Sequence, residues 1–151
     1  NPGFVSLIGI ESPGLTSAPA IARYVMEEFV RPRLAPGLRP GARAGRPAPR
    51  RIAEMPPEEL ARACAEDPAF GEIVCRCNHV SKAEVRAALD NPLGARTLSA
   101  VKKRTHAMMG RCQSGFCLPK ILEIMTEEYG IDPASAVANA PGSNPVVGYE
   151  A

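Results

Sequence analysis

Apolar residues recur at helical spacing in three short segments in the second half of the chain. Ser81 and Glu84 have the spacing of a capping box, which predicts a helix over about 82–90 with Val85 and Leu89 facing inward. A second helix is predicted from about Thr97 to a stop at Gly110, and a third from about Pro119 to a stop at Gly130. The expected inward positions of these two helices are Leu98, Val101, Thr105 and Met108, and Ile121, Leu122, Ile124 and Met125. Three small helices are therefore expected over residues 71–130.

The N-terminal segment has a different pattern. Residues 4–10 form a short apolar run, typical of a buried strand, and turn residues follow it. Thr16 or Ser17 can cap a helix whose apolar positions recur about every four residues, at Ile21, Val25 and Phe29. We therefore predict a strand, a turn and a helix over residues 1–30.

Proline and arginine dominate residues 31–51, which hold seven arginines, no acid and no periodic apolar face. This composition predicts an extended linker, which we place over 31–70 together with one short helix that ends before Pro68. No aromatic residue stands among the arginines to stack on bases, so nucleic-acid binding is not expected. The tail, 131–151, has no strong period and is expected to wrap back over the body or to stay loose.

Composition limits what the chain can be. Its 151 residues, 45% of them hydrophobic, can bury one modest core or two small ones, and 16 prolines and 13 glycines favour two. The formal charge of +2 is nearly neutral, no apolar run is long enough to enter a membrane, and no secretion signal is recognisable. A cytoplasmic protein is expected. Because the chain opens on Asn1 and runs directly into apolar residues, we expect it to be a fragment of a longer polypeptide.

Four of the five cysteines form two close pairs: Cys75 with Cys77, and Cys112 with Cys117, with 34 residues between the pairs. Disulfides are disfavoured, because cysteines one residue apart bridge poorly and the protein is expected to be intracellular. Thiolates select zinc or an iron–sulfur cluster. Only the second pair has a spacing usual for structural zinc, and the spacing matches neither common ferredoxin pattern, so both metals, and thiols that never meet, stay open. The fifth cysteine, Cys64, is expected to be a small buried hydrophobe.

The surroundings of these cysteines carry a family resemblance. Residues 73–80, 101–105 and 109–117 together resemble the [2Fe-2S] domain of the bacterioferritin-associated ferredoxin type. They are more closely similar to its version at the C-terminus of FAD-dependent oxidoreductases of the anaerobic glycerol-3-phosphate dehydrogenase or 2-hydroxy-acid oxidase type. The resemblance implies that Cys75, Cys77, Cys112 and Cys117 hold the cluster. Asn78 stands where a glutamate is common in that family, at a position that is not a ligand.

The charged groups near the cysteines suit such a centre. A [2Fe-2S] cluster with four thiolates is anionic, so donor-rich and basic surroundings are expected. Arg76, Arg111 and Lys120 lie within a few residues of the cysteines, and Gly115 is expected to let backbone approach the sulfurs. The same three side chains can equally be ordinary surface charge. Three tiny helices bury too little to fold securely alone, so cluster assembly and folding are expected to be coupled.

A second resemblance concerns the N-terminal segment. Residues 9–22 look like the last strand-to-helix turn of the glycine/D-amino-acid oxidase-like flavoprotein fold. The resemblance implies that Gly14, Leu15 and Thr16 approach the pyrimidine end of a flavin. The G-x-G-x-x-G fingerprint is absent, so FAD would need upstream residues as well.

Together these patterns predict a mostly α chain: a small helical [2Fe-2S] domain with two cysteine loops, preceded by a strand-turn-helix remnant of an α/β flavoprotein domain. The predicted function is to pass electrons from FAD through the cluster in a dehydrogenase acting on glycerol 3-phosphate or a related 2-hydroxy acid. The expected partners are the upstream FAD domain and an electron-acceptor protein or subunit. No catalytic residue is expected within the chain, which lacks a Ser/His/Asp set or carboxylate pair. The alternatives are a stand-alone [2Fe-2S] module for electron transfer or interaction, and a structural zinc module.

Overall fold

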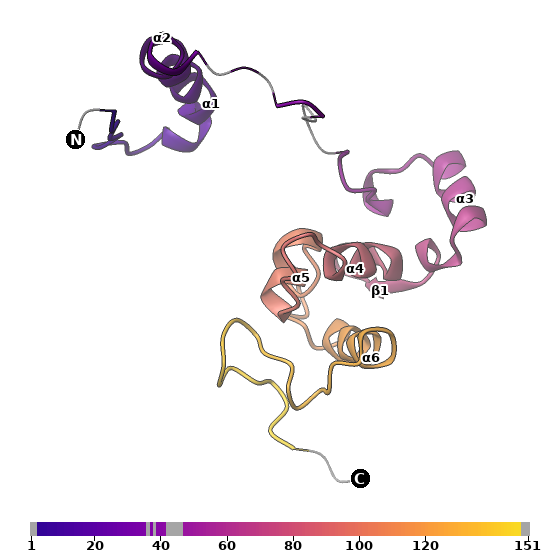
Figure 1. Ribbon diagram of the computed structural model, residues 1–151. Helices are drawn as coiled ribbons and strands as arrows, with labels where there is room; N and C mark the ends of the chain where they lie inside the picture. Colours follow the sequence, from indigo (N-terminus) through magenta and orange to yellow (C-terminus); the bar gives the residue numbers. More distant parts are fainter. Residues whose placement is uncertain (1–2, 36, 38, 42–46, 149–151) are drawn as a thin grey trace. The chain divides into compact units, whose positions relative to one another are not determined.

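Helices make up most of the secondary structure, and one two-stranded sheet accompanies them, as the computed structural model shows (Figure 1). This confirms the predicted mostly α class. The structure describes residues 3–35, 37, 39–41 and 47–148. The chain divides into two units, residues 1–46 and 47–151.

The first unit is one helical stretch. It consists of α1 (Gly14–Val25), a π-helical turn (Met26–Val30) and α2 (Arg31–Leu34), and Ala35 in the left-handed conformation ends it. The helix therefore continues through residues 31–34, which we had expected to be extended. Residues 36, 38 and 42–46 of the predicted linker lie outside the described residues.

Two predictions for this unit were wrong. Residues 4–10 form no strand, and the described residues of this unit offer no second strand to pair with them. A strand is stable only when a neighbour accepts and donates its backbone hydrogen bonds. The helix also begins earlier than expected, at Gly14 after Pro13, and no side chain caps it, so neither Thr16 nor Ser17 is the cap.

The first unit has no core of its own among its described residues, because none of them is buried. Large apolar side chains are open to solvent, with Leu15 93% and Ile8 84% exposed. The rings of Tyr24 and Phe29 meet edge to face at 5.9 Å, which covers only part of that surface.

The second unit holds the remaining elements in one body. In order they are η2 (Ile52–Glu54), α3 (Pro57–Glu66), η3 (Pro68–Phe70), β1 (Ile73–Cys75), β2 (Val80–Ser81), α4 (Lys82–Leu89), α5 (Leu98–Thr105) and α6 (Cys117–Tyr129). The antiparallel hairpin of β1 and β2 was not predicted. It pairs Ile73 with Ser81 and Cys75 with Val80, with an irregularity between the two pairs.

Two of the helix ends lie where the sequence predicts them. The capping box of α4 forms: the Ser81 hydroxyl accepts from the Glu84 N–H at 3.3 Å, and the Glu84 carboxylate accepts from the Ser81 N–H at 3.0 Å. Gly130, with a φ of 64°, ends α6 as predicted. By contrast, α5 ends at Thr105, and left-handed His106 follows it, so Gly110 does not close that helix.

The core of the second unit lies between β1, α4, α5 and α6. The predicted inward residues Val85, Leu89, Val101 and Ile121 are all fully buried. The other members of the core cluster are Val74, Cys75, Val80, Leu98, Ala107, Met108, Cys117, Ile124, Met125 and Ala136. Two of the cysteines are thus part of the core itself.

Residues 50–70 pack onto this body. The Ile52 N–H donates to the buried Glu84 carboxylate at 3.5 Å, which connects η2 to α4. Arg50 lies over the ring of Phe70 at 4.8 Å and pairs with Glu66 at 3.0 Å.

The C-terminal segment returns to the start of α5. The N–H groups of Leu98 and Ser99 donate to the carbonyls of Val137 and Ala138, at 3.0 and 2.9 Å. These N–H groups open the helix and have no partner within it. Ala136, from the same segment, is buried in the core.

Charged side chains join α4 to α6 on the surface. Glu128 accepts from the Arg86 guanidinium and pairs with Lys82 at 3.1 Å, and Arg86 also lies 4.0 Å from Asp67. The two cations hold the pKa of Glu128 at about 2, with the hydrogen bond from Arg86 as the main cause. Among the described residues, no helix is both long and apolar enough to cross a bilayer.

Candidate metal centre

The four paired cysteines come from two loops of the second unit. Cys75 ends β1 and is buried, and Cys77 follows in the exposed turn of the hairpin. Cys112 is half-buried in the loop between α5 and α6, and Cys117 is the first residue of α6 and is buried. Cys77 and Cys112 therefore lie in loops, whereas Cys75 belongs to a strand and Cys117 to a helix.

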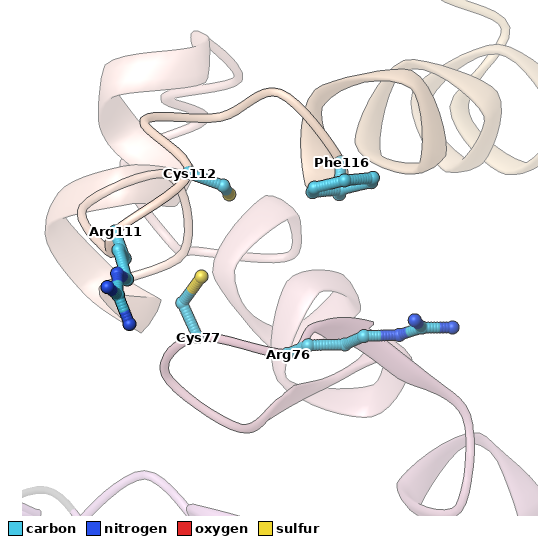
Figure 2. Close-up of a pocket in the computed structure, with 5 residues that line it drawn as sticks. All are labelled: Arg76, Cys77, Arg111, Cys112 and Phe116. Atoms are coloured by element: carbon cyan, nitrogen blue, oxygen red, sulfur yellow. The ribbon is translucent and has the colours of Figure 1, made fainter.

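The structure brings these cysteines together as two pairs. The side chains of Cys77 and Cys112 lie close enough to interact, and their sulfurs face the same pocket (Figure 2). Cys117 interacts with Cys75, and electrostatically with Cys112. Cys77 is exposed and Cys112 half-buried, while Cys75 and Cys117 are each 1% exposed.

Within the part of the chain that the structure describes, no three His, Cys, Asp or Glu side chains converge as a site for a single ion. A [2Fe-2S] cluster has a different requirement, because four thiolates share two irons. Two pairs of thiols supply the four sulfur ligands that such a centre needs.

The loop before α6 wraps backbone donors around Cys112. Gln113 and Ser114 both have left-handed φ values, 48° and 76°, and this bend turns the N–H groups of the loop toward the Cys112 sulfur. The backbone N–H of Phe116 is the main cause of a lowered pKa of Cys112, followed by the Cys77 side chain. Amide donors to a cysteine sulfur stabilise its thiolate, the form that binds metal.

Cys117 has the opposite environment. Its pKa is raised to about 11, mainly by burial and also by the neighbouring Cys75. A thiol in such a place keeps its proton at neutral pH unless a metal displaces it. Metal binding by Cys117 would therefore release a proton.

Gly110 allows the two cysteine loops to approach each other. A Cβ placed on Gly110 would lie 2.2 Å from the Cβ of Cys77 and 3.2 Å from its sulfur. We had assigned this close approach to Gly115, where an added Cβ would meet only the carbonyl oxygen of Cys112, at 3.2 Å. Gly110 could have been noticed in the sequence as a glycine two residues before Cys112, but its contact with Cys77 could not have been predicted.

Basic side chains surround the cysteine pairs. Arg76 and Arg111 line the pocket together with Phe116, and no carboxylate is among the lining residues (Figure 2). The Lys120 ammonium donates to the Ile73 carbonyl at 3.2 Å, so it reaches from α6 to β1. These charges suit an anionic centre.

The predicted flavin-contacting residues lie in the first unit. Gly14, Leu15 and Thr16 open α1, and Gly14 lies so close to Ile10 that an added Cβ would be 2.5 Å from the Ile10 Cγ2. Leu15 and Thr16 are exposed. Their contact with a flavin stays a prediction. Cys64 is half-buried on α3 beside Gly71, so it is less buried than expected.

Comparison with known proteins places the cysteines within a known kind of domain. Residues 73–127 match the family of BFD-like [2Fe-2S] binding domains, a range that includes all four paired cysteines. No solved structure matches the chain.

Two curated proteins are similar over a longer range. The chain is 38% identical over 143 residues to a protein named glycerol 3-phosphate dehydrogenase from Caloramator mitchellensis, which covers 93% of this chain and 29% of that protein. It is 32% identical over 85 residues to anaerobic glycerol-3-phosphate dehydrogenase subunit A1 from Haloferax volcanii, which covers 56% of this chain and 13% of the relative. The chain thus spans less than a third of either relative. The resemblance to the [2Fe-2S] domain of glycerol-3-phosphate dehydrogenases is confirmed.

Proposed function

We propose that this chain is the electron-transfer portion of an FAD-dependent dehydrogenase, starting from the fact that residues 73–127 form a BFD-like [2Fe-2S] binding domain. The observation that carries the proposal is the meeting of two cysteine pairs from distant loops inside that domain. The names of the two relatives support glycerol 3-phosphate, or a related 2-hydroxy acid, as the substrate class of the whole enzyme.

Cys75, Cys77, Cys112 and Cys117 would hold the cluster, which when bound supplies one-electron redox chemistry. The chain's own part is to present four thiolates and to control their surroundings. The core excludes water from Cys75 and Cys117, while the loop before α6 directs amide donors at Cys112. Hydrogen bonds to the sulfurs and nearby positive charge both raise the reduction potential of such a centre.

The first unit would supply one wall of the flavin site. Gly14, Leu15 and Thr16 stand at the N-terminus of α1, where the helix dipole favours negative charge, such as that on a reduced flavin. Large apolar side chains of this unit are exposed, and the remainder of a flavin domain would bury them. Substrate oxidation would then belong to the upstream FAD domain, and this chain would not be catalytic by itself. A cytoplasmic location and a separate electron-acceptor protein or subunit belong to the same proposal.

A second candidate is a stand-alone [2Fe-2S] module for electron transfer or interaction. The division of the chain favours it, because all the buried residues described belong to the second unit. That unit therefore has the core needed to fold without a flavin domain.

Anaerobic purification tests the cluster assignment. We expect about two irons and two labile sulfides per chain, a reddish-brown colour and an EPR signal after one-electron reduction. Cys77→Ser should lose most of the iron, while the control Cys64→Ser should keep it. One zinc per chain without colour would contradict the proposal. In the full-length protein, adding glycerol 3-phosphate should produce the reduced-cluster EPR signal; a cluster that responds only to other donors would favour the stand-alone module.

A further inference from the structure

The pocket between the cysteine loops opens onto a basic face. Arg76 and Arg111 line it, both are exposed, and neither forms an ion pair with any other described residue. Arg50 and Arg86, elsewhere on the second unit, are already paired with acids. The two pocket arginines are thus available to carboxylates from another molecule.

An exposed aromatic ring stands at the same pocket. Phe116 lies just before α6 and is 76% exposed. Phe70, elsewhere on this unit, is covered by Arg50 at 4.8 Å. An exposed phenylalanine at the same pocket as two unpaired arginines has the composition of a protein-protein contact centre, where aromatic residues and Arg are enriched.

The cysteines make this face the exposed side of the centre. Cys77 is exposed and Cys112 half-buried at the pocket, while Cys75 and Cys117 are covered by the core. Electron transfer becomes steeply slower with distance. A partner that exchanges electrons with the centre therefore gains most by binding over Cys77 and Cys112.

We propose that this face, formed by Arg76, Cys77, Arg111 and Phe116, docks an acidic one-electron carrier protein. The inference rests on the proposed electron-transfer function. Carboxylates on the partner would form bidentate ion pairs with the two guanidiniums, and an apolar patch on the partner would cover the Phe116 ring. Each encounter moves one electron: the reduced chain is oxidised by one electron and the carrier is reduced by one, and no bond or proton changes. Nucleic acid is a poorer fit, because a single aromatic ring cannot stack a run of bases.

The test uses the whole chain, loaded with its cluster and reduced anaerobically. Stopped-flow mixing compares two high-potential acceptors of opposite charge, an acidic blue-copper protein and a basic c-type cytochrome. The wild-type chain should reduce the acidic acceptor faster, and this rate should fall as salt is added. Arg76→Glu with Arg111→Glu should slow that reaction at least tenfold and speed the reaction with the cytochrome. Phe116→Ala should slow the acidic reaction without changing its salt dependence.

A matched control carries the same change of net charge elsewhere. Arg62→Glu with Lys103→Glu alters two exposed residues that do not line the pocket, and its rates should stay within about twofold of wild type. Rates are compared after each variant's reduction potential has been measured, since charge near the centre shifts it. Equal rates for the two double variants, or a wild-type preference for the cytochrome, would overturn the docking face. Iron and sulfide content are measured first, so a chain without a cluster refutes the proposed function, whereas a loaded chain that is indifferent to acceptor charge refutes only this inference.

Discussion

Replacing Gly110 with alanine tests whether the two cysteine loops must approach as closely as the structure has them. The new Cβ would lie 2.2 Å from the Cβ of Cys77, whereas carbon atoms in ordinary contact are about 3.5–4 Å apart. One of the two loops must therefore move by more than about 1 Å. Metal–ligand distances tolerate only about 0.2 Å, so the displaced Cys77 sulfur should bind poorly.

We expect Gly110→Ala to retain less than half of the wild-type iron and sulfide after anaerobic reconstitution. Overpacking of this kind costs about 1–3 kcal/mol, which should lower the Tm of the second unit by about 5–15 °C. Gly148→Ala is the matched control, because a Cβ at that position meets no atom within 4 Å. If Gly110→Ala binds two irons and its visible spectrum is that of the wild type, the loops are not held together at this point and the reasoning fails.

Three other changes probe the second unit. Cys117→Ser should abolish iron binding measured by metal analysis, while Cys64→Ser should not; equal losses would contradict the ligand assignment. Ser81→Ala should cost about 1 kcal/mol in urea unfolding, through the lost helix cap. Because Arg86 holds the pKa of Glu128 at about 2, below its usual 4.5, Glu128→Gln should destabilise by about 1 kcal/mol above pH 4.5, and the difference should vanish as the pH falls towards 2. A pH-independent difference would argue against the ion pairs.

The sequence predicted the helices of the second unit because their stop and start residues act locally. Ser81 and Glu84 cap α4 through side chains three residues apart, and Gly130 ends α6 through its own φ angle. The cysteine pairs could also be recognised from the sequence, since their spacing and neighbours resemble a known domain. All of these features depend on a few consecutive residues.

The features that the sequence did not reveal depend on partners distant in the chain. The β1–β2 hairpin is too short to show a period of two, and the contact between Gly110 and Cys77 joins loops that are more than thirty residues apart. The strand expected over 4–10 failed for the same reason, because no neighbouring strand is described to pair with it. The sequence also gave no sign that Val137 would accept the first hydrogen bond of α5.

The meeting of the hairpin turn with the start of α6 has a consequence for chain entropy. If one centre binds Cys77 and Cys112, it closes a loop with 34 residues between its ends, much as a crosslink would. A covalent link across a loop of that length removes unfolded-state entropy worth about 4 kcal/mol. That is a large share of the total stability of a domain this small. The centre would then stabilise the fold as well as carry electrons. A chain that loses it would be expected to unfold first where α6 meets the hairpin.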